Sequence, residues 1–242
     1  MTALAVYDAP TAALASEAGV DLLLVGDSMG NVILGFANTL PVTLSMILHH
    51  TAAVARARPA SLVVSDIPFT EAHRDPDTLM AAAARCLQEA GAGAVKIEGG
   101  VAMADKIRLL TTAGIPVVGH IGLLPQQIYQ MGGYRRFGKT PEERDSLLAD
   151  ARAVAEAGAF AVVAEMVDSE TAGMIAREIP VPLIGIGSGP HCDGQILVGQ
   201  DLLGLSPGKP PPFVKAYARL GEAVKTAFSE YVREVRERKF PS

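Results

Sequence analysis

The sequence predicts a (β/α)8 TIM barrel, and three observations support this fold class. Short apolar runs recur along the chain, Ala-rich helical stretches separate them, and 242 residues suit about eight such units. Apolar runs without strict alternation are typical of parallel strands that are covered on both faces. An open, doubly wound parallel sheet is the alternative architecture for the same pattern.

Eight apolar runs are the expected strands. In chain order they are ALAVYD, DLLLVGD, SLVVSDIPF, AVKIEGG, PVVGHIGL, AFAVVAEMV, PLIGIGSG and the weaker QILVGQDLLG, which begin at residues 3, 21, 61, 94, 116, 159, 182 and 195. Each run except the last is short, continuous and bounded by turn or helix signals, as expected for strands of a buried sheet.

Two of the helices between these runs carry clear boundary signals. In the stretch from Asp75 to Ala90, an Asp precedes Pro76 at the first turn, and Gly91 follows as the stop. The stretch from Glu142 to Ala157 ends in the same way at Gly158. These signals predict two helices of ordinary length on the outside of the barrel.

The C-terminal segment from Phe213 to Lys239 is expected to form a long, charged amphipathic helix that caps the barrel or mediates assembly. Neither a break in composition nor a linker rich in Pro, Gly and Ser interrupts the chain. Residues 1–242 are therefore expected to form a single (β/α)8 domain with a C-terminal helix.

Composition argues against several functional classes. The net charge of -5 offers no basic footprint for nucleic acid, and Cys86 and Cys192 form no CxxC pair for a disulfide framework or a zinc cage. No signal-peptide pattern begins the chain. The uncharged segments Ser28–Ala55 and Leu109–Tyr134 are interrupted by polar residues, Gly or Pro, so neither predicts a membrane span. We expect a cytoplasmic protein that acts on small molecules.

Polar side chains end most of the apolar runs. They are Asp8, Asp27, Asp66, Glu98, His120 and Glu165. The C-terminal ends of barrel strands share one face, where active sites form, so these side chains should converge. Crowded carboxylates raise one another's pKa and resist burial, and a divalent cation is the simplest compensation. Asp27, Asp66 and Glu98 are hard oxygen donors, which favours Mg²⁺ over zinc. The alternative is that the acidic residues cap the following helices.

Lys96 and Glu98 lie two residues apart in the same run, so both side chains should point to one face of the strand. If that face is the barrel interior, a Lys is buried near the metal. A buried Lys usually pairs with a charge, and a substrate carboxylate would serve. An internal bridge between Lys96 and Glu98 is the alternative.

Eight motifs, in this order, resemble the ketopantoate hydroxymethyltransferase family. They are VGDSMG, TLPVT, HHTAAV, DIPF, VKIEGG, GHIGLLPQ, GGYRRFGKT and IGIGSGPHCDGQILV, and the resemblance runs from about Tyr7 to Pro241. It implies a barrel of the phosphoenolpyruvate mutase/isocitrate lyase-like superfamily that assembles as a homodecamer from two pentamers. It also implies transfer of a one-carbon unit from 5,10-methylenetetrahydrofolate to 3-methyl-2-oxobutanoate in pantothenate and coenzyme A biosynthesis, with one Mg²⁺ per subunit.

The resemblance assigns roles residue by residue. It implies that Asp27 and Asp66 are metal ligands and that Glu98 is the third carboxylate at the metal, directly or through water. The residues that correspond to the oxo-acid pocket are Asp27, Ser28, Asp66, Lys96 and His120. Glu165 corresponds to the base that accepts a proton. Family members usually carry a further segment before the first strand, so the resemblance implies less about assembly than about chemistry.

Two motifs suggest phosphate sites. Residues 133–140, GYRRFGKT, match the Walker A pattern, but PQQIYQMG before them is a poor strand, and the loop carries bulky side chains. We expect a loop whose arginines face solvent or another subunit. The Gly-rich IGIGSGPHCDG follows the seventh run, a common place for phosphate in barrels. The resemblance favours room for the folate or the substrate there.

Two other functions compete with the transferase. One is a Mg-dependent lyase or mutase of the same superfamily, acting on an oxo acid or a phosphonate; such enzymes commonly use a KKCGH-type loop, which this sequence lacks. The other is a non-catalytic barrel that serves as a scaffold or binding module. The intact set of charged residues at the strand ends opposes it, because charges that are costly to bury would be lost from a decaying site.

Overall fold

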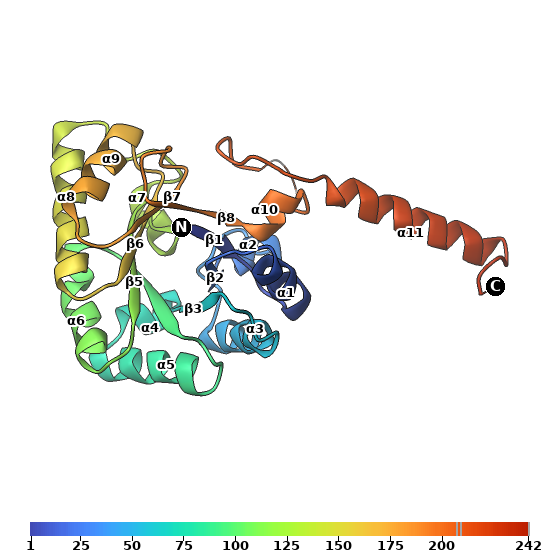
Figure 1. Cartoon of the computed structure of the whole chain (residues 1–242), viewed down its shortest axis with the longest axis horizontal. Helices are drawn as coiled ribbons and strands as arrows, with labels where there is room; N and C mark the ends of the chain where they lie inside the picture. The colour runs from blue at the N-terminus through green and yellow to red at the C-terminus, as the bar shows by residue number, and fades with distance from the viewer. Residues whose placement is uncertain (207, 209, 242) are drawn as a thin grey trace. The chain divides into compact units, whose positions relative to one another are not determined.

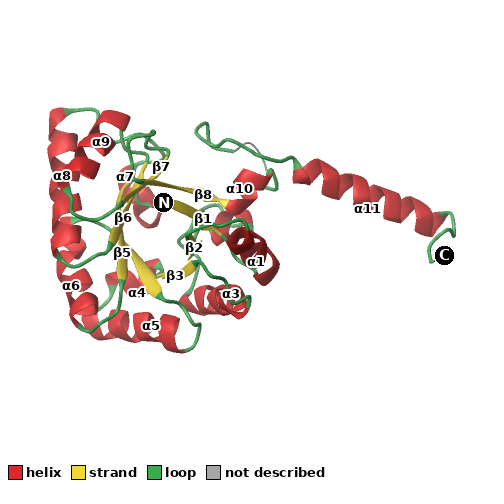
Figure 2. Ribbon diagram, viewed as in Figure 1, coloured by secondary structure: helices red, strands yellow, loops and turns green. Residues whose placement is uncertain are grey.

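The computed structural model describes residues 1–206, 208 and 210–241. In this part of the chain, parallel strands close into a barrel in the sequential order β1 to β8, as Figures 1 and 2 show. The strands are β1 Thr2–Ala5, β2 Leu22–Val25, β3 Leu62–Asp66, β4 Ala94–Glu98, β5 Val117–Gly122, β6 Ala161–Glu165, β7 Leu183–Ile186 and β8 Gly194–Val198. The closed order confirms the (β/α)8 prediction and is incompatible with an open sheet.

The chain divides into two compact units, Met1–Ile196 and Leu197–Ser242. The helices of the first unit are α1 Ala9–Glu17, α2 Met29–Val32, α3 Leu44–Arg56, α4 Phe69–His73, α5 Pro76–Gln88, α6 Ala104–Thr112, α7 Ile128–Met131, α8 Pro141–Glu156 and α9 Ser169–Glu178, with the 3-10 turns η1 Val101–Met103 and η2 Pro125–Gln127. The second unit holds α10 Gly199–Leu203 and α11 Leu220–Arg236. That the whole chain acts as one domain stays a prediction.

Local capping sets where the barrel helices begin. Asp75 accepts a hydrogen bond from the N–H of Thr78 at the start of α5, and Thr140 accepts one from the N–H of Glu143 at the start of α8. Each cap satisfies an N–H that lacks a partner within its helix, and a Pro follows each cap at the first helical position. Both helices lie within two residues of their predicted bounds.

Alternate residues of the strands belong to two apolar layers, one inside the barrel and one between the strands and the helices. Inside the barrel pack Ala3, Leu22, Leu24, Val64, Ala94, Val118, Ala161, Val163, Ile184 and Ile196. The intervening positions, such as Val95 and Ile97 of β4, pack outward against the helices. Because successive strand residues face opposite sides, this alternation determines which side chains reach the barrel interior.

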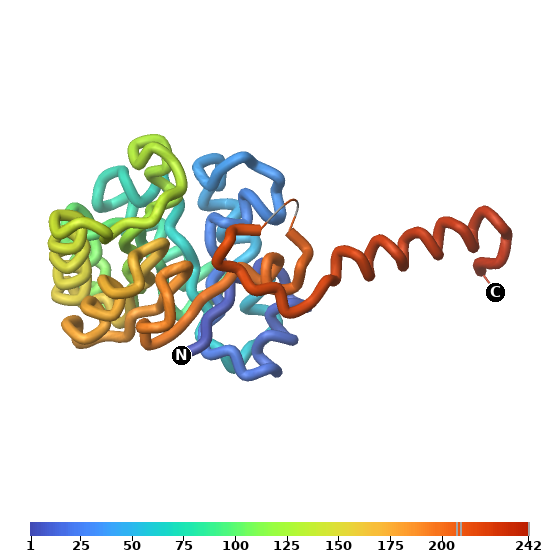
Figure 3. The backbone as a smooth tube through the Cα atoms, turned by 90° about the horizontal axis from the view of Figure 1, so that it is seen from above, coloured from blue at the N-terminus to red at the C-terminus, as the bar shows by residue number. Residues whose placement is uncertain are grey.

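The barrel closes between its first and last strands through main-chain contacts. The terminal amino group of Met1 donates to the carbonyl of Asp193 at 2.9 Å, and the N–H of Gln195 donates to the carbonyl of Met1 at 3.1 Å. Figure 3 views the barrel from the side, with the N-terminus at one end and the segments after β2 and β5 at the other. These latter segments follow strand C-termini and border the polar end of the interior.

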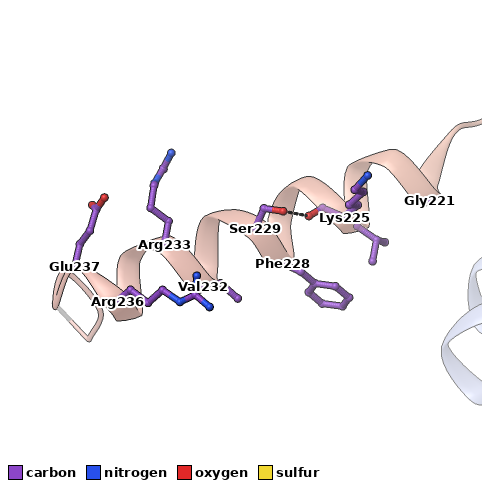
Figure 4. A pocket seen from close by; sticks show the side chains of 9 residues that line it. Gly221, Lys225, Phe228, Ser229, Val232, Arg233, Arg236 and Glu237 are labelled. Carbon is purple, nitrogen blue, oxygen red and sulfur yellow. Dashed lines mark hydrogen bonds between the residues drawn. The ribbon is translucent and has the colours of Figure 1, made fainter.

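The C-terminal helix is shorter than predicted, since α11 begins at Leu220 and not at Phe213. The N–H of Tyr217 bonds to the carbonyl of Leu202, so it is not available to a helix that begins at Phe213. None of the residues of α11 is buried. Figure 4 shows its side chains, including an exposed Phe228, with the Ser229 hydroxyl bonded to the carbonyl of Lys225.

In the described ranges, none of the helices is both long enough and apolar enough to cross a membrane.

Candidate active site and metal centre

The inward side chains of β3 to β6 change from apolar to polar toward the C-terminal end of the barrel. On β4, Ala94 belongs to the apolar interior, whereas Lys96 and Glu98 are buried and charged. In the sheet register Asp66 is level with Lys96, and Glu98 is level with His120. Neighbouring strands therefore bring together residues that are 22 to 30 positions apart in the sequence.

Asp27, Asp66 and Glu98 form a buried carboxylate cluster. One oxygen from each lies within 4.8 Å of the others, and the three residues are at most 3% exposed. The N–H of Asp27 donates to Oδ2 of Asp66 at 3.0 Å. Burial raises the pKa of Asp66 well above its usual value, and the charges of Asp27 and Glu98 raise it further. Burial likewise raises the pKa of Glu98. The raised pKa values mean that ionising all the carboxylates at once is unfavourable here unless a positive charge compensates them.

Lys96 supplies the positive charge inside this cluster. Its Nζ lies 3.0 Å from Oδ2 of Asp66 and 3.2 Å from Oε1 of Glu98, so the internal bridge considered for this residue is present and includes a second carboxylate. Burial acts to lower the pKa of Lys96, but the nearby carboxylates outweigh burial and raise it. Three ionised carboxylates against one ammonium leave two negative charges, which match a divalent cation.

The donor set fits Mg²⁺. All three ligand candidates are carboxylates, which this hard cation prefers, and no thiol or imidazole belongs to the set. In addition, Oδ1 of Asp66 is buried and has no hydrogen-bond partner in the described residues. A buried carboxylate oxygen without a partner is costly, so its position indicates a ligand that the protein itself does not supply.

His120 lies between the cluster and the end of β6. Its Nδ1 lies 3.6 Å from Oε1 of Glu98, and its Nε2 lies 3.2 Å from Oε2 of Glu165. Burial lowers the pKa of His120 to about 4, and the positive charge of Lys96 acts in the same direction. The imidazole is therefore neutral near pH 7 and can donate from one ring nitrogen while accepting at the other.

Glu165 is the last residue of β6, and 16% of its side chain is exposed. Its pKa is raised to about 8: burial is the main cause, the positive charge of Lys96 acts to lower the pKa, and the charge of Asp27 acts to raise it. The backbone around it is tightly held, because the N–H of Leu123 donates to the carbonyl of Glu165 at 2.8 Å. A side chain at Gly122, whose φ is +92°, would lie 2.3 Å from that carbonyl oxygen, so this close approach requires glycine.

Ser28 follows Asp27 directly at the start of α2. The hydroxyl oxygens of Ser28 and Tyr7 are 2.8 Å apart, and Tyr7 is 1% exposed. The Tyr7 hydroxyl therefore contacts a residue predicted to bind the oxo acid.

Asp8 does not belong with the other five strand-end residues. It caps α1, where its Oδ1 accepts from the N–H of Thr11 at 2.8 Å and its Oδ2 accepts from the Thr11 hydroxyl at 2.9 Å. For this residue the helix-capping alternative is therefore the correct one. The other five predicted residues are linked by the contacts described above.

Sequence reasoning gave no role to Gln126, which the structure shows inside the cluster. Its backbone N–H donates to Oε2 of Glu98 at 3.0 Å, and its Nε2 donates to Oδ2 of Asp27 and to the carbonyl of Ile67, both at 3.0 Å. Gln126 ends the motif GHIGLLPQ, and an amide side chain directly after an apolar run was the only signal that the sequence offered.

The Walker-like loop has a different organisation from a phosphate cradle. The N–H groups of Gly138 and Lys139 donate to Oε2 of Glu143 at 2.9 and 3.1 Å. Arg135 also contacts Glu143, through an Nη1 to Oε1 distance of 2.6 Å. A carboxylate of α8 thus occupies the donors that would face a phosphate, and this loop forms the N-terminal cap of the helix.

Sequence comparison identifies close relatives. The family model described as ketopantoate hydroxymethyltransferase matches residues 1–242. A 3-methyl-2-oxobutanoate hydroxymethyltransferase from Pyrobaculum calidifontis is 53% identical over 236 residues, which cover 98% of this chain and 88% of the relative. One from Moorella thermoacetica is 49% identical over 241 residues, which cover 100% of this chain and 90% of the relative.

Comparison of structures shows the same barrel at much lower sequence identity. The phosphoenolpyruvate phosphomutase from Streptomyces platensis subsp. rosaceus is 17% identical, with a TM-score of 0.64 over 98% of this chain and 83% of its own. A phosphonopyruvate hydrolase in complex with oxalate and Mg²⁺ is 16% identical, with a TM-score of 0.64 over 98% of this chain and 82% of its own. These similarities show that the chain shares the fold of these barrels.

Proposed function

Because the chain belongs to the ketopantoate hydroxymethyltransferase family, we propose that it moves a one-carbon unit from 5,10-methylenetetrahydrofolate to C3 of 3-methyl-2-oxobutanoate. The product is 2-dehydropantoate, on the route to pantothenate and coenzyme A. The observation that carries this proposal is the buried cluster of Asp27, Asp66 and Glu98, with Glu165 beside it at the same end of the barrel.

Asp27, Asp66 and Glu98 would hold one Mg²⁺ in each subunit. The two negative charges that Lys96 leaves uncompensated and the unpartnered Oδ1 of Asp66 support this assignment. When bound, the ion supplies a Lewis acid that stabilises the negative charge of the substrate enolate. The phosphonopyruvate hydrolase with the same barrel was crystallised with Mg²⁺ and oxalate, a small dicarboxylate, which agrees with a cation and an organic acid at such a site.

Lys96 and Ser28 would orient the oxo acid. The carboxylates around Lys96 keep its ammonium charged, so it can attract the substrate carboxylate without itself giving up a proton. The Ser28 hydroxyl can donate to the same carboxylate while it accepts from Tyr7, which lies 2.8 Å away. Two donors of this kind would hold C3 in a constant position relative to Glu165.

Glu165 would act as the base. It accepts the C3 proton, and the electron pair of the broken C–H bond forms the C2–C3 double bond of the enolate. Water hydrolyses the methylene bridge of the folate: its oxygen bonds to the methylene carbon as both carbon–nitrogen bonds break, which releases tetrahydrofolate and leaves the carbon at the oxidation level of formaldehyde. C3 of the enolate then attacks this carbonyl carbon, and the resulting alkoxide takes up a proton to become the hydroxyl group of the product. A pKa raised to about 8 by burial suits a base that works near neutral pH. Nε2 of His120 lies 3.2 Å from the carboxylate without forming a hydrogen bond to it in the described residues, so a small shift of the ring would let it orient Glu165.

The assembly would be a homodecamer of two pentamers, as the family resemblance implies. The exposed Val224, Phe228 and Val232 on α11 support an interface of some kind, because large apolar side chains rarely stay open to water in groups. Light scattering after gel filtration measures the mass directly. Ten chains of 25.2 kDa predict about 250 kDa, and a monomer of about 25 kDa would contradict this part of the proposal.

Omission of each component from the assay tests the reaction itself. Formation of 2-dehydropantoate should require 3-methyl-2-oxobutanoate, 5,10-methylenetetrahydrofolate and Mg²⁺ together, and EDTA should stop it until excess Mg²⁺ is added. A folded protein that forms no product from this complete mixture would contradict the proposed reaction.

A further inference from the structure

Gln126 connects two members of the carboxylate cluster that come from different strands. Asp27 follows β2 and Glu98 ends β4, and both accept a hydrogen bond of 3.0 Å from Gln126. Glu98 accepts from the main chain, and Asp27 accepts from the side chain. The Gln126 side chain is thus a donor to the Asp27 carboxylate. Gln126, in η2, therefore fixes the distance between the carboxylates of Asp27 and Glu98.

The contacts of the Gln126 amide determine its orientation. Both neighbours of its nitrogen, Oδ2 of Asp27 and the carbonyl of Ile67, are acceptors, so the NH₂ end must face them. The opposite end, Oε1, is then buried and lacks a hydrogen-bond partner in the residues that the structure describes. Gln126 as a whole is 2% exposed. Buried acceptors in native proteins normally bind a donor, often an ordered water.

We propose that Gln126 is a positioning residue for the metal centre. It holds the carboxylates of Asp27 and Glu98 at the spacing that a divalent cation needs, and its Oε1 accepts a hydrogen bond from a water that the bound cation brings. The inference rests on the metal site described under the proposed function. Mg²⁺ usually keeps several of its waters when it binds to a protein, and one of these waters could donate a hydrogen bond to Oε1 of Gln126.

Without the Gln126 amide, Asp27 loses this donor and lies beside two like charges. The carboxylate would turn away from Asp66 and Glu98, and a cation would have to pull the three together again on binding. Outer contacts of this kind typically change metal affinity about 10- to 100-fold. Folding should lose some stability as well, because Oδ2 of Asp27 and the carbonyl of Ile67 each lose a donor, so metal affinity must be measured on the folded variant.

The test is Gln126→Met, which keeps the length of the side chain and removes its amide. Calorimetric titration of the folded variant with Mg²⁺ should show binding about 10- to 100-fold weaker than in the wild type, and the melting temperature in EDTA shows separately how much stability the lost donor removes. In assays, saturating Mg²⁺ should restore most of kcat. The matched control is Gln130→Met, at an exposed position of α7, and it should change neither quantity.

An affinity within twofold of the wild type would overturn the inference, whether or not the melting temperature falls. Gln126→Asn keeps an amide but is one methylene too short to reach Asp27, and it should weaken binding like the Met variant. It decides the question if the Met variant does not fold. A wild-type protein that binds no Mg²⁺ would overturn the metal site and this inference together. If the wild type binds Mg²⁺ and the Gln126 variants bind it equally well, the inference alone is overturned.

Discussion

Nε2 of His120 and Oε2 of Glu165 are 3.2 Å apart at the ends of the neighbouring strands β5 and β6. The other ring nitrogen of His120 lies 3.6 Å from Glu98, so one neutral imidazole lies between the proposed base and the proposed metal ligands. A neutral ring has one N–H to donate, and it can therefore support only one of the two carboxylates at a time. This arrangement separates the proton-accepting residue from the cation-binding cluster.

Glu165→Gln should separate catalysis from metal binding. The change keeps the shape of the side chain and removes the base, so the transfer rate should fall at least about 10²- to 10⁴-fold. Mg²⁺ affinity should stay within about threefold, because Glu165 lies outside the set Asp27, Asp66 and Glu98. Steady-state assays and calorimetry measure the two quantities. The control Glu170→Gln, at an exposed position of α9, should alter neither; a large loss of Mg²⁺ affinity in Glu165→Gln would refute the division of roles.

The rate of proton removal from the substrate should rise with pH. Glu165 must be ionised to accept a proton, and burial raises its pKa to about 8, so the rate should increase about tenfold per pH unit below that value and level off above it. A bound cation lowers the pKa of a nearby carboxyl, so the midpoint should lie at or below 8. His120, with a pKa of about 4, adds no step between pH 6 and 9. A rate that falls between pH 6 and 8 would argue against Glu165 as the base.

The metal-free protein should lose stability as pH rises from about 4 to about 8. The pKa values of Asp66 and Glu98 are raised in the folded state, and that of Glu165 is raised to about 8, chiefly by burial. The folded state therefore holds protons that the unfolded chain has released, and this stabilisation disappears as the groups ionise. Exposed carboxyls with lowered pKa values, such as Asp75, act only below about pH 4. His120, whose pKa is lowered to about 4, acts in the opposite direction between about pH 4 and 6.5, but it is one group against three carboxyls.

Melting temperatures in EDTA at pH 5 and pH 8.5 test this expectation. The value at pH 8.5 should be lower, Mg²⁺ should raise it more at pH 8.5 than at pH 5, and Asp66→Asn should reduce the pH dependence in EDTA. An EDTA melting temperature that increases from pH 5 to pH 8.5 would show that the cluster does not dominate in this range.

Lys96→Met should destabilise the metal-free protein. The change removes the ammonium that lies 3.0 Å from Asp66 and 3.2 Å from Glu98, and it leaves buried carboxylates without compensation. Loss of one partner from a buried ion pair costs about 3–5 kcal/mol of unfolding free energy. Urea unfolding in EDTA measures the loss, and Mg²⁺ should recover part of it. Lys139→Met, on an exposed loop, should have no effect; equal stability of Lys96→Met and the wild type would contradict the account.

Much of the site could be predicted from sequence because strand geometry is a local property. Once VKIEGG is recognised as a strand, the two-residue spacing puts Lys96 and Glu98 on one face, and their contact at 3.2 Å confirms it. The shared orientation of parallel strands then brings Asp66 and His120 to the same end of the barrel. These inferences need only the strand period and the closed barrel.

The failures have equally specific causes. For Asp8, the following Pro10 and Thr11 already formed a capping signal that favours a helix start over an inward side chain. The partner that keeps Tyr217 out of α11 is the carbonyl of Leu202, which no local pattern identifies. The role of Gln126 depends on its contacts with Glu98, which lies 28 positions earlier in the chain, and with Asp27, which lies 99 positions earlier. Only the folded structure can reveal these contacts.

The measurement that tests the central claim most directly is loss of the C3 proton of 3-methyl-2-oxobutanoate in D₂O, followed by NMR without folate. The account predicts exchange in the presence of Mg²⁺, none in EDTA and none with Glu165→Gln. Exchange that continues in EDTA, or at the wild-type rate in Glu165→Gln, would contradict it, as would the absence of exchange in a folded protein that binds Mg²⁺.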